Sequence, residues 1–234
     1  MLFKRTVISA ALLLTISTSG YSQSVEFGDP NLKAAVEETL GVSDPTSADM
    51  EKLTVLSAVS LGITSAKGLE YAVNLEEVEL DFNRIQDLAP LAELQNLKKL
   101  WMCDNDLVDI SAVSRITSLE RVQMENNLLS DVSAFAGLTN LIELELDHNQ
   151  ISDISALSGL RNIEILELEN NRISDLSPIL EMSKMSLLNV RDNPVENYEV
   201  AVKLPMLQYY WIGESSVIEK LQPMFSERSN FIIR

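Results

Sequence analysis

A period of 22 residues runs through most of this chain and restricts the folds that it can adopt. An asparagine recurs six times at that interval with no insertion between copies, at Asn83, Asn105, Asn127, Asn149, Asn171 and Asn193. An apolar frame recurs in register with it. Because one copy alone cannot bury its apolar side, the copies must stack on one another. The sequence therefore predicts a solenoid of stacked coils.

One copy, LIELELDHNQISDISAL (141–157), indicates what each coil forms. Apolar and acidic residues alternate from Glu143 to Asp147, which predicts a short strand with one buried and one wet face. The chain turns at Asn149, whose amide can bond main-chain groups that would otherwise be buried without a partner. An aspartate that can cap a short return segment follows each turn, at Asp87, Asp109, Asp131, Asp153 and Asp175.

The pattern LxxLxLxxNxIxDIsxL resembles the leucine-rich repeats of the bacterial internalin type. The segments VEFGDPNLKAAVEETLG (25–41) and TSADMEKLTVL (46–56) are also similar to the helical cap that precedes internalin repeats. The resemblance implies an α/β solenoid with a curved parallel β-sheet on its concave face, short 3₁₀ or helical segments on its convex face, and a helical N-terminal cap. It also implies a platform for binding proteins.

The residues of the cap support helices independently of the resemblance. Asp29 can cap a helix that has Pro30 at its first position, and Gly41 can end that helix. Thr46 and Asp49 have the spacing of a capping box, with Asp in place of Glu. Two short helices are therefore expected before the first coil.

The chain divides into four parts by sequence. Residues 1–22 are predicted to be a secretory signal peptide, because two basic residues precede an apolar run that is too short to span a bilayer. The other parts are a helical cap at 25–60, the repeats at 53–193, and a degenerate last coil with a C-terminal cap at 194–234. Cleavage is expected after Ser22, with Gly20 and Ser24 as alternatives. The product would be secreted or periplasmic, with no membrane insertion after cleavage.

The charge balance excludes some classes of partner. The chain has 35 acidic and 18 basic residues, a net charge of −17. That sign opposes binding to a nucleic-acid backbone or to anionic lipid. Cys103 is the single cysteine, so no internal disulfide can form and stability must come from packing.

Acidic residues concentrate on the predicted wet face. Its positions are the third, fifth, seventh and eighth of each repeat, and ten of these 20 positions in five repeats are acidic while two are basic. Because neighbouring strands lie about 4.8 Å apart, carboxylates of successive coils repel one another. Exposed Trp and Tyr frequently anchor interfaces. We therefore predict that a protein or peptide with a basic patch binds a face formed by Glu79, Asp81, Phe82, Trp101, Glu125, Glu143, Glu145, Asp147, His148, Glu167, Glu169, Tyr209 and Trp211.

Other interpretations of this face remain open. It can be a solvated acidic surface with no specific ligand, which serves solubility. It can also belong to a calcium-responsive structural solenoid, although parallel strands do not converge six to eight oxygens on one point. Tyr209 and Trp211 can instead pack under a closing helix expected at 215–225.

Neither catalysis nor a cofactor or metal is expected. His148 is the single histidine and has no neighbouring nitrogen or sulfur ligands in the pattern, nor a nucleophile beside it. Cys103 is expected at an outward position, where Asp104 would disfavour its thiolate. A regular sheet also offers no closed pocket that excludes water. The sequence therefore favours a binding protein over an enzyme.

Overall fold

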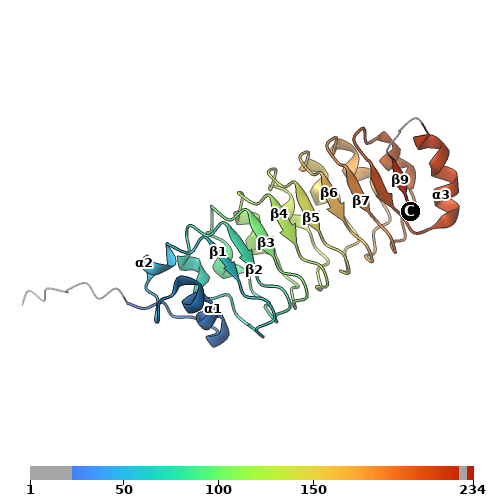
Figure 1. Cartoon of the computed structure of the whole chain (residues 1–234). Coiled ribbons are helices and arrows are strands. Elements are labelled where there is room, and N and C mark those ends of the chain that lie inside the picture. Colours follow the sequence, from blue (N-terminus) through green and yellow to red (C-terminus); the bar gives the residue numbers. More distant parts are fainter. Residues whose placement is uncertain (1–22, 227–230) are drawn as a thin grey trace, which may run out of the picture.

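The computed structural model describes residues 23–226 and 231–234, so the predicted signal peptide lies outside the described residues. The described chain forms an elongated array of stacked coils (Figure 1). One parallel sheet runs along the array, with nine strands in sequence order. The strands are β1 (Val55–Ser57), β2 (Glu77–Glu79), β3 (Lys99–Trp101), β4 (Arg121–Gln123), β5 (Glu143–Glu145), β6 (Ile165–Glu167), β7 (Leu187–Asn189), β8 (Tyr209–Trp211) and β9 (Ile232–Ile233).

The return segments of the coils are short 3₁₀ helices, as predicted. They are η1 (Leu69–Tyr71), η2 (Ala89–Leu91), η3 (Ser111–Arg115), η4 (Ser133–Phe135), η5 (Ser155–Gly159), η6 (Ser177–Glu181) and η7 (Tyr198–Lys203). The α-helices lie at the two ends: α1 (Pro30–Leu40) and α2 (Ser47–Met50) before the coils, and α3 (Ser215–Leu221) after them (Figure 1). Together with the sheet, these elements confirm the predicted leucine-rich repeat solenoid.

Strand register follows the sequence period. Each residue of β1 to β7 pairs with the residue 22 positions later, as Glu145 does with Glu167. The middle residue of each of these strands is buried, so its two neighbours in the strand point to the other face. The apolar frame forms one continuous core, in which Leu141, Leu144 and Leu146 are 0% exposed.

The recurring asparagines hold the coils together from inside. The Nδ2 of Asn149 donates to the carbonyl oxygens of Met124, Leu146 and Asp147, at 2.9, 3.0 and 3.2 Å. Its Oδ1 accepts from the amide of Leu129 at 3.0 Å. Two of these partners belong to the preceding coil, so each buried asparagine satisfies main-chain groups of its own coil and of the coil before it. This role was predicted and is confirmed.

A second column of asparagines was not predicted from the sequence. The Nδ2 atoms of Asn74, Asn96, Asn140 and Asn162 donate to carbonyl oxygens of residues 23 positions earlier, at 2.8–3.0 Å. These residues share the 22-residue period with gaps, so the signal was present in the sequence. Their bonds join successive coils just before each strand begins.

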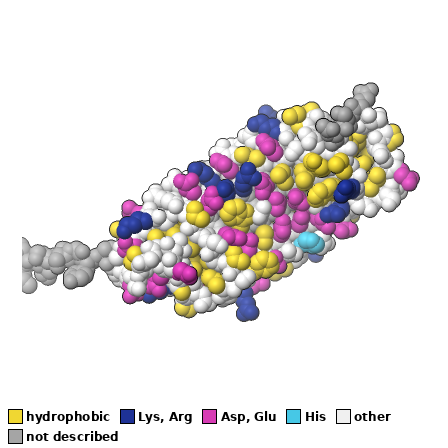
Figure 2. Space-filling view, viewed as in Figure 1, with side chains coloured by type: hydrophobic (Ala, Val, Ile, Leu, Met, Phe, Trp, Pro, Cys, Tyr) yellow, Lys and Arg dark blue, Asp and Glu magenta, His cyan; other side chains and the backbone are white. Residues whose placement is uncertain are grey.

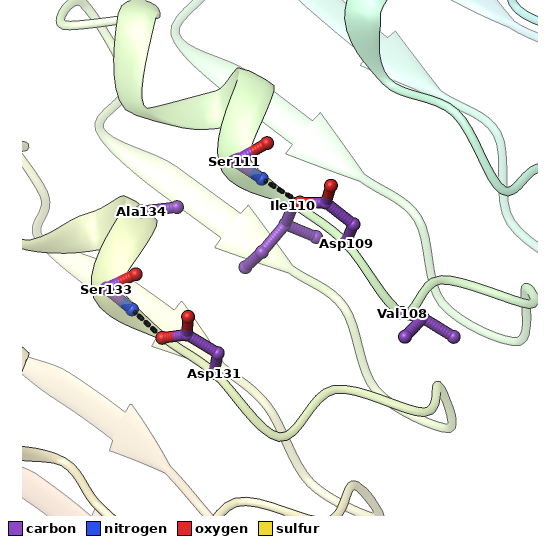
Figure 3. Close-up of a pocket in the computed structure, with 7 residues that line it drawn as sticks. All are labelled: Val108, Asp109, Ile110, Ser111, Asp131, Ser133 and Ala134. Carbon is purple, nitrogen blue, oxygen red and sulfur yellow. Dashed lines mark hydrogen bonds between the residues drawn. The ribbon is translucent and has the colours of Figure 1, made fainter.

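The aspartates after each turn cap the 3₁₀ segments, as predicted. In Figure 3, Asp109 accepts from the amide of Ser111 and Asp131 accepts from that of Ser133, both at 2.8 Å. The hydrogen bond from Ser111 lowers the pKa of Asp109. These carboxylates line a shallow pocket between η3 and η4, away from the sheet face (Figure 3). Because both carboxylates are engaged in capping, this pocket is not a candidate functional site.

The N-terminal cap agrees with its predicted signals. Asp29 caps α1, with Pro30 following, and Gly41 ends the helix in the left-handed conformation at φ 65°. Thr46 and Asp49 form the capping box of α2. Asp29 has a further role that the sequence did not indicate, because its Oδ2 accepts from both the amide and the hydroxyl of Thr64, each at 2.9 Å. These two hydrogen bonds connect the N-terminus of α1 to the first coil.

The C-terminal end closes the core with a helix and a last strand. The predicted closing segment consists of α3 followed by η8 (Gln222–Phe225). The rings of Phe225 and Phe231 stack at a centroid distance of 3.7 Å. The predicted terminal strand forms as β9, parallel to β8. In residues 23–226 and 231–234, no helix has the length and apolar character to cross a membrane.

The asparagine ladder leads to a prediction about stability. Asn149→Ala should lower the free energy of unfolding by about 3 kcal/mol, because it leaves a buried amide and carbonyls without partners. Asp153→Ala, which removes an exposed cap, should cost clearly less, because water can bond the freed amide. Urea denaturation followed by circular dichroism measures both. Equal losses would contradict the role of the ladder.

Candidate functional site

Three rows of outward side chains cross the strands on the sheet face. The first row holds the first residue of each strand: Val55, Glu77, Lys99, Arg121, Glu143, Ile165, Leu187, Tyr209 and Ile232. The second row holds the third residue: Ser57, Glu79, Trp101, Gln123, Glu145, Glu167, Asn189 and Trp211. The third row lies two residues further: Asp81, Cys103, Glu125, Asp147, Glu169 and Arg191. Strand register makes successive members of the first two rows spatial neighbours.

Ion pairs neutralise the first row from β2 to β5. The Nζ of Lys99 lies 2.7 Å from a carboxylate oxygen of Glu77. Arg121 pairs with Glu143, which also accepts a hydrogen bond of 3.0 Å from Gln123. Glu143 is only 8% exposed. It was predicted to contact a partner, but the structure places it inside the protein's own ion pair, so we exclude it from the available surface.

The second and third rows contain four carboxylates that we call the acidic cluster: Glu125, Glu145, Asp147 and Glu167. Glu145 and Glu167 are direct neighbours in the register of β5 and β6. Within the described part of the chain, no Lys or Arg forms an ion pair with any of the four, although such pairs form on both sides of them. Figure 2 shows carboxylates gathered over the middle of the sheet.

Burial and repulsion between carboxylates raise the pKa values of Glu145, Asp147 and Glu167. Burial raises the pKa of Asp147 to about 7, and the charges of Glu167 and Glu125 add to the effect, although the amide of Glu169 donates to Asp147 at 2.5 Å. Burial, followed by the contact with Glu125 and the charge of Glu167, holds the pKa of Glu145 well above its usual range. Burial also raises the pKa of Glu167. Ionising the cluster is therefore unfavourable in the folded protein.

Arg191 bounds the acidic cluster at its C-terminal side. Its Nη2 lies 2.6 Å from Glu169, which also accepts a hydrogen bond of 2.9 Å from Asn189. Although burial opposes them, these two hydrogen bonds lower the pKa of Glu169. The guanidinium of Arg191 also lies over the ring of Trp211, 5.3 Å from its centroid. Glu169 and Trp211, both predicted as partner contacts, thus already have partners within the chain.

The aromatic side chains of the predicted face differ in exposure. Phe82 is 57% exposed and Tyr209 is 40% exposed. The exposure of Tyr209 argues against the alternative in which the closing helix covers it. Trp101 is half-buried, with the Nζ of Lys99 5.8 Å from its ring centroid. His148 is exposed, and its Nδ1 lies 2.7 Å from the Nδ2 of Asn170.

At the N-terminal end of the face, two carboxylates accept hydrogen bonds from the chain itself, and a third residue is buried. Glu79 accepts from the hydroxyl of Ser57 at 2.7 Å, and Asp81 accepts from the amide of Cys103 at 2.7 Å. Cys103 stands in the third row, at the outward position expected from the repeat, but it is only 8% exposed. Its small side chain lies between longer carboxylates of the third row. Burial and the charge of Asp81, rather than of Asp104, raise the pKa of its thiol to about 12.

The described residues offer oxygen donors but no metal-binding arrangement. Residues 23–226 and 231–234 contain no group of three or more His, Cys, Asp or Glu side chains placed to hold a metal ion. The strands keep the carboxylates in rows, so they line up along the array instead of converging on one point. The predictions of no metal and no cofactor remain predictions.

These features define the class of the protein: a leucine-rich repeat solenoid whose sheet carries an acidic cluster. The leucine rich repeat family matches residues 130–173. Internalin C2 from Listeria monocytogenes strain 4b F2365 is 33% identical, with a TM-score of 0.80 over 89% of this chain and 93% of that chain. The chain therefore belongs to the bacterial leucine-rich repeat proteins of the internalin type.

Two further solved structures are similar to this chain. Internalin F from the same Listeria strain is 23% identical, with a TM-score of 0.48 over 83% of this chain and 80% of that chain. The ectodomain of the plant receptor kinase GASSHO1/SCHENGEN3 from Arabidopsis thaliana is 20% identical, with a TM-score of 0.55 over 62% of this chain and 19% of that chain, a likeness of fold alone. No curated protein sequence matches this chain.

The raised pKa of Asp147 predicts how stability depends on pH. Its folded-state value of about 7 lies above its ordinary value of 3.8, so the folded protein binds the proton more tightly and loses stability as pH rises between these values. From pH 5 to pH 8, the wild type should lose on the order of 1 kcal/mol more than Asp147→Asn, after allowance for solvent screening. Denaturant titrations at each pH test this. Parallel pH profiles would contradict it.

Backbone strain at the eighth position of the repeat makes a further prediction. Phe82 has φ 57°, in the left-handed region where the equivalent Asn126 has φ 52°. Asparagine tolerates this region and a bulky aromatic does not. Phe82→Asn should therefore raise the free energy of unfolding by about 1 kcal/mol, and Asn126→Phe should lower it by a similar amount. Chemical denaturation of both variants is the test, and a loss of stability in Phe82→Asn would refute the strain.

Proposed function

We propose that this chain is an exported binding protein whose concave sheet face captures a partner protein or peptide with a basic patch. The acidic cluster carries the proposal. Lys99, Arg121 and Arg191 pair with Glu77, Glu143 and Glu169, yet within the described residues the four carboxylates of the cluster have no cationic partner. A partner that supplies cations would complete the charge pattern of the face.

The energy of the unpaired carboxylates supports this proposal. Two like charges at about 5 Å repel by roughly 1 kcal/mol in water and by several times more where water is partly excluded. Glu145, Asp147 and Glu167 are all half-buried, and their pKa values are raised. Lys or Arg side chains of a partner would convert this repulsion into attraction. They would also accelerate association by electrostatic steering.

Aromatic side chains of the face provide a second type of contact. Phe82 and Trp101 lie toward the N-terminal end of the face, and Tyr209 lies toward its C-terminal end. Large aromatic side chains commonly carry much of the binding energy at protein interfaces. Phe82 retains a strained backbone conformation while its ring is 57% exposed, so the folded chain alone gains little from it. We assign Phe82 to the binding face on this ground.

The fold is consistent with protein binding. The Arabidopsis leucine-rich repeat ectodomain was crystallised in complex with CASPARIAN STRIP INTEGRITY FACTOR 2, and we propose that the present repeats also serve as a binding platform. The likeness is one of fold, so the partner's chemistry is argued from the sheet face alone. The apolar run after two basic residues in 1–22 supports export, as a secreted or periplasmic protein.

Neutralising the acidic cluster should abolish capture. The triple variant Glu145→Gln, Asp147→Asn and Glu167→Gln keeps side-chain shape and removes three carboxyl groups that can ionise against a bound cation. Purified protein would be immobilised and exposed to the culture medium of the producing organism at physiological salt, and retained proteins quantified by mass spectrometry. Proteins retained by the wild type should fall at least about tenfold with the triple variant, because each lost contact to a charged group contributes about 1 kcal/mol or more.

A matched control separates local charge from net charge. Glu38→Gln, Asp106→Asn and Glu199→Gln together also remove three charges, at exposed positions away from the sheet face. This control should retain the same proteins as the wild type. If the cluster variant retains them as well, the sheet face is not the binding surface and the proposal fails.

A further inference from the structure

The first row of the sheet face changes chemistry at β6. From β2 to β5 it consists of paired charges, whereas from β6 onward it consists of an apolar row: Ile165, Leu187, Tyr209 and Ile232. Tyr209 and Ile232 are 40% and 38% exposed, and the other two are half-buried. Figure 2 shows hydrophobic side chains gathered over β6 to β8, directly beside the carboxylates. The sequence prediction of the site included Tyr209 but not the other three.

The apolar row and the acidic cluster overlap at one strand. On β6, Ile165 belongs to the apolar row and Glu167 to the acidic cluster, two residues and about 7 Å apart. From there the cluster extends back toward β4 and the apolar row extends forward toward β9. The face is therefore acidic in one half and apolar in the other along the axis of the array.

Charge decides which kind of surface can cover both halves. A second copy of this chain carries a net charge of −17 and would add carboxylates to carboxylates. An anionic membrane would be repelled for the same reason. Arg191, in the third row just after β7, would repel a cation placed beyond the cluster. Cations of a partner therefore belong over β4 to β6, and apolar side chains over β6 to β8.

This inference rests on the proposed function: we propose that the partner contacts this face with a segment that has two chemically different halves, which we call bipartite. One half of the segment is rich in Lys or Arg and lies over the acidic cluster, and the other half is apolar and packs on the apolar row. From β4 to β8 the segment spans four strand spacings, about 19 Å. A helix fits this path, because side chains three or four residues apart are separated by about 5–6 Å, close to the strand spacing of about 4.8 Å.

Two synthetic peptides of equal composition test the proposal. Both are alanine-rich helical peptides of about 20 residues with three Lys and three Leu along one stripe. In the bipartite peptide the three Lys precede the three Leu, and in the interspersed peptide Lys and Leu alternate along the stripe. Their affinities for the purified protein would be measured by fluorescence anisotropy in about 150 mM salt. The bipartite peptide should bind about tenfold more tightly, in either chain direction.

Variants of the protein locate the two halves. Leu187→Ser and Tyr209→Ser should each weaken the bipartite peptide about fivefold, because each removes apolar contact area, and should change the interspersed peptide less. Met206→Ser removes a side chain that is 59% exposed and lies outside the rows, so it should change neither affinity. Thermal melts check the folding of each variant. Since Tyr209 is the more exposed of the two, Tyr209→Ser decides the outcome if Leu187→Ser does not fold.

The outcomes separate this inference from the function on which it rests. Equal affinity of the two peptides, with both weakened by the Glu145→Gln, Asp147→Asn, Glu167→Gln variant, would leave the basic-patch proposal standing and overturn the bipartite segment. Peptide binding that is indifferent to this triple variant would overturn both. A bipartite preference that is largely lost in Tyr209→Ser, with the triple variant weakening both peptides, is the result expected.

Discussion

The hydrogen bonds of the buried asparagines hold this protein in its strict repeat geometry. Each asparagine donates hydrogen bonds to carbonyls of its own coil and of the preceding coil, and accepts one from a main-chain amide of the preceding coil. These bonds fix the register of the two coils at 22 residues. A coil that slipped by one residue would bury these polar groups unpaired and turn its leucines to the wet face. Because the offset is fixed, side chains at equal positions of the repeat become neighbours. Every row on the sheet face follows from this constraint.

The same geometry creates an electrostatic problem that the chain resolves only in part. Because residues at equal positions of the repeat are neighbours, like charges lie side by side on adjacent strands, which weakens a sheet. In the first row, Lys99 and Arg121 stand beside Glu77 and Glu143 and neutralise them. In the third row, Arg191 neutralises Glu169. Between these pairs, Gln123 faces Glu145 where a second cation would fit the pattern, and Glu145 faces Glu167. The acidic cluster thus lies between the ion pairs of Arg121 and Arg191, where no cation of the described chain meets it.

The fold could be read from the sequence because the period alone determines which residues become neighbours. The asparagine ladder, the aspartate caps and the Thr46–Asp49 box are local or periodic, and all were predicted. The site was harder, because exposure depends on how far side chains reach. Glu143 and Glu145 have similar sequence neighbours. Arg121 forms an ion pair with Glu143, whereas no Lys or Arg among the described residues forms one with Glu145. The register already contained that distinction. The burial of Cys103 and the hydrogen bonds that Thr64 donates to Asp29 did not follow from any period, because they depend on side-chain packing within the folded coils.

A repeat protein with a uniform binding face would hold its partner poorly in register. Because successive coils are about 4.8 Å apart, a basic segment on an endless acidic ladder could shift by one coil and meet nearly the same contacts. The change of chemistry at β6 removes this degeneracy: a shift by one coil in one direction moves apolar side chains onto carboxylates, and in the other direction moves cations toward Arg191. The buried positions must stay constant to maintain the ladder, whereas the outward positions vary freely from coil to coil. Specificity in such a protein can therefore arise from where along the array the outward chemistry changes, with no change in the fold that supports it.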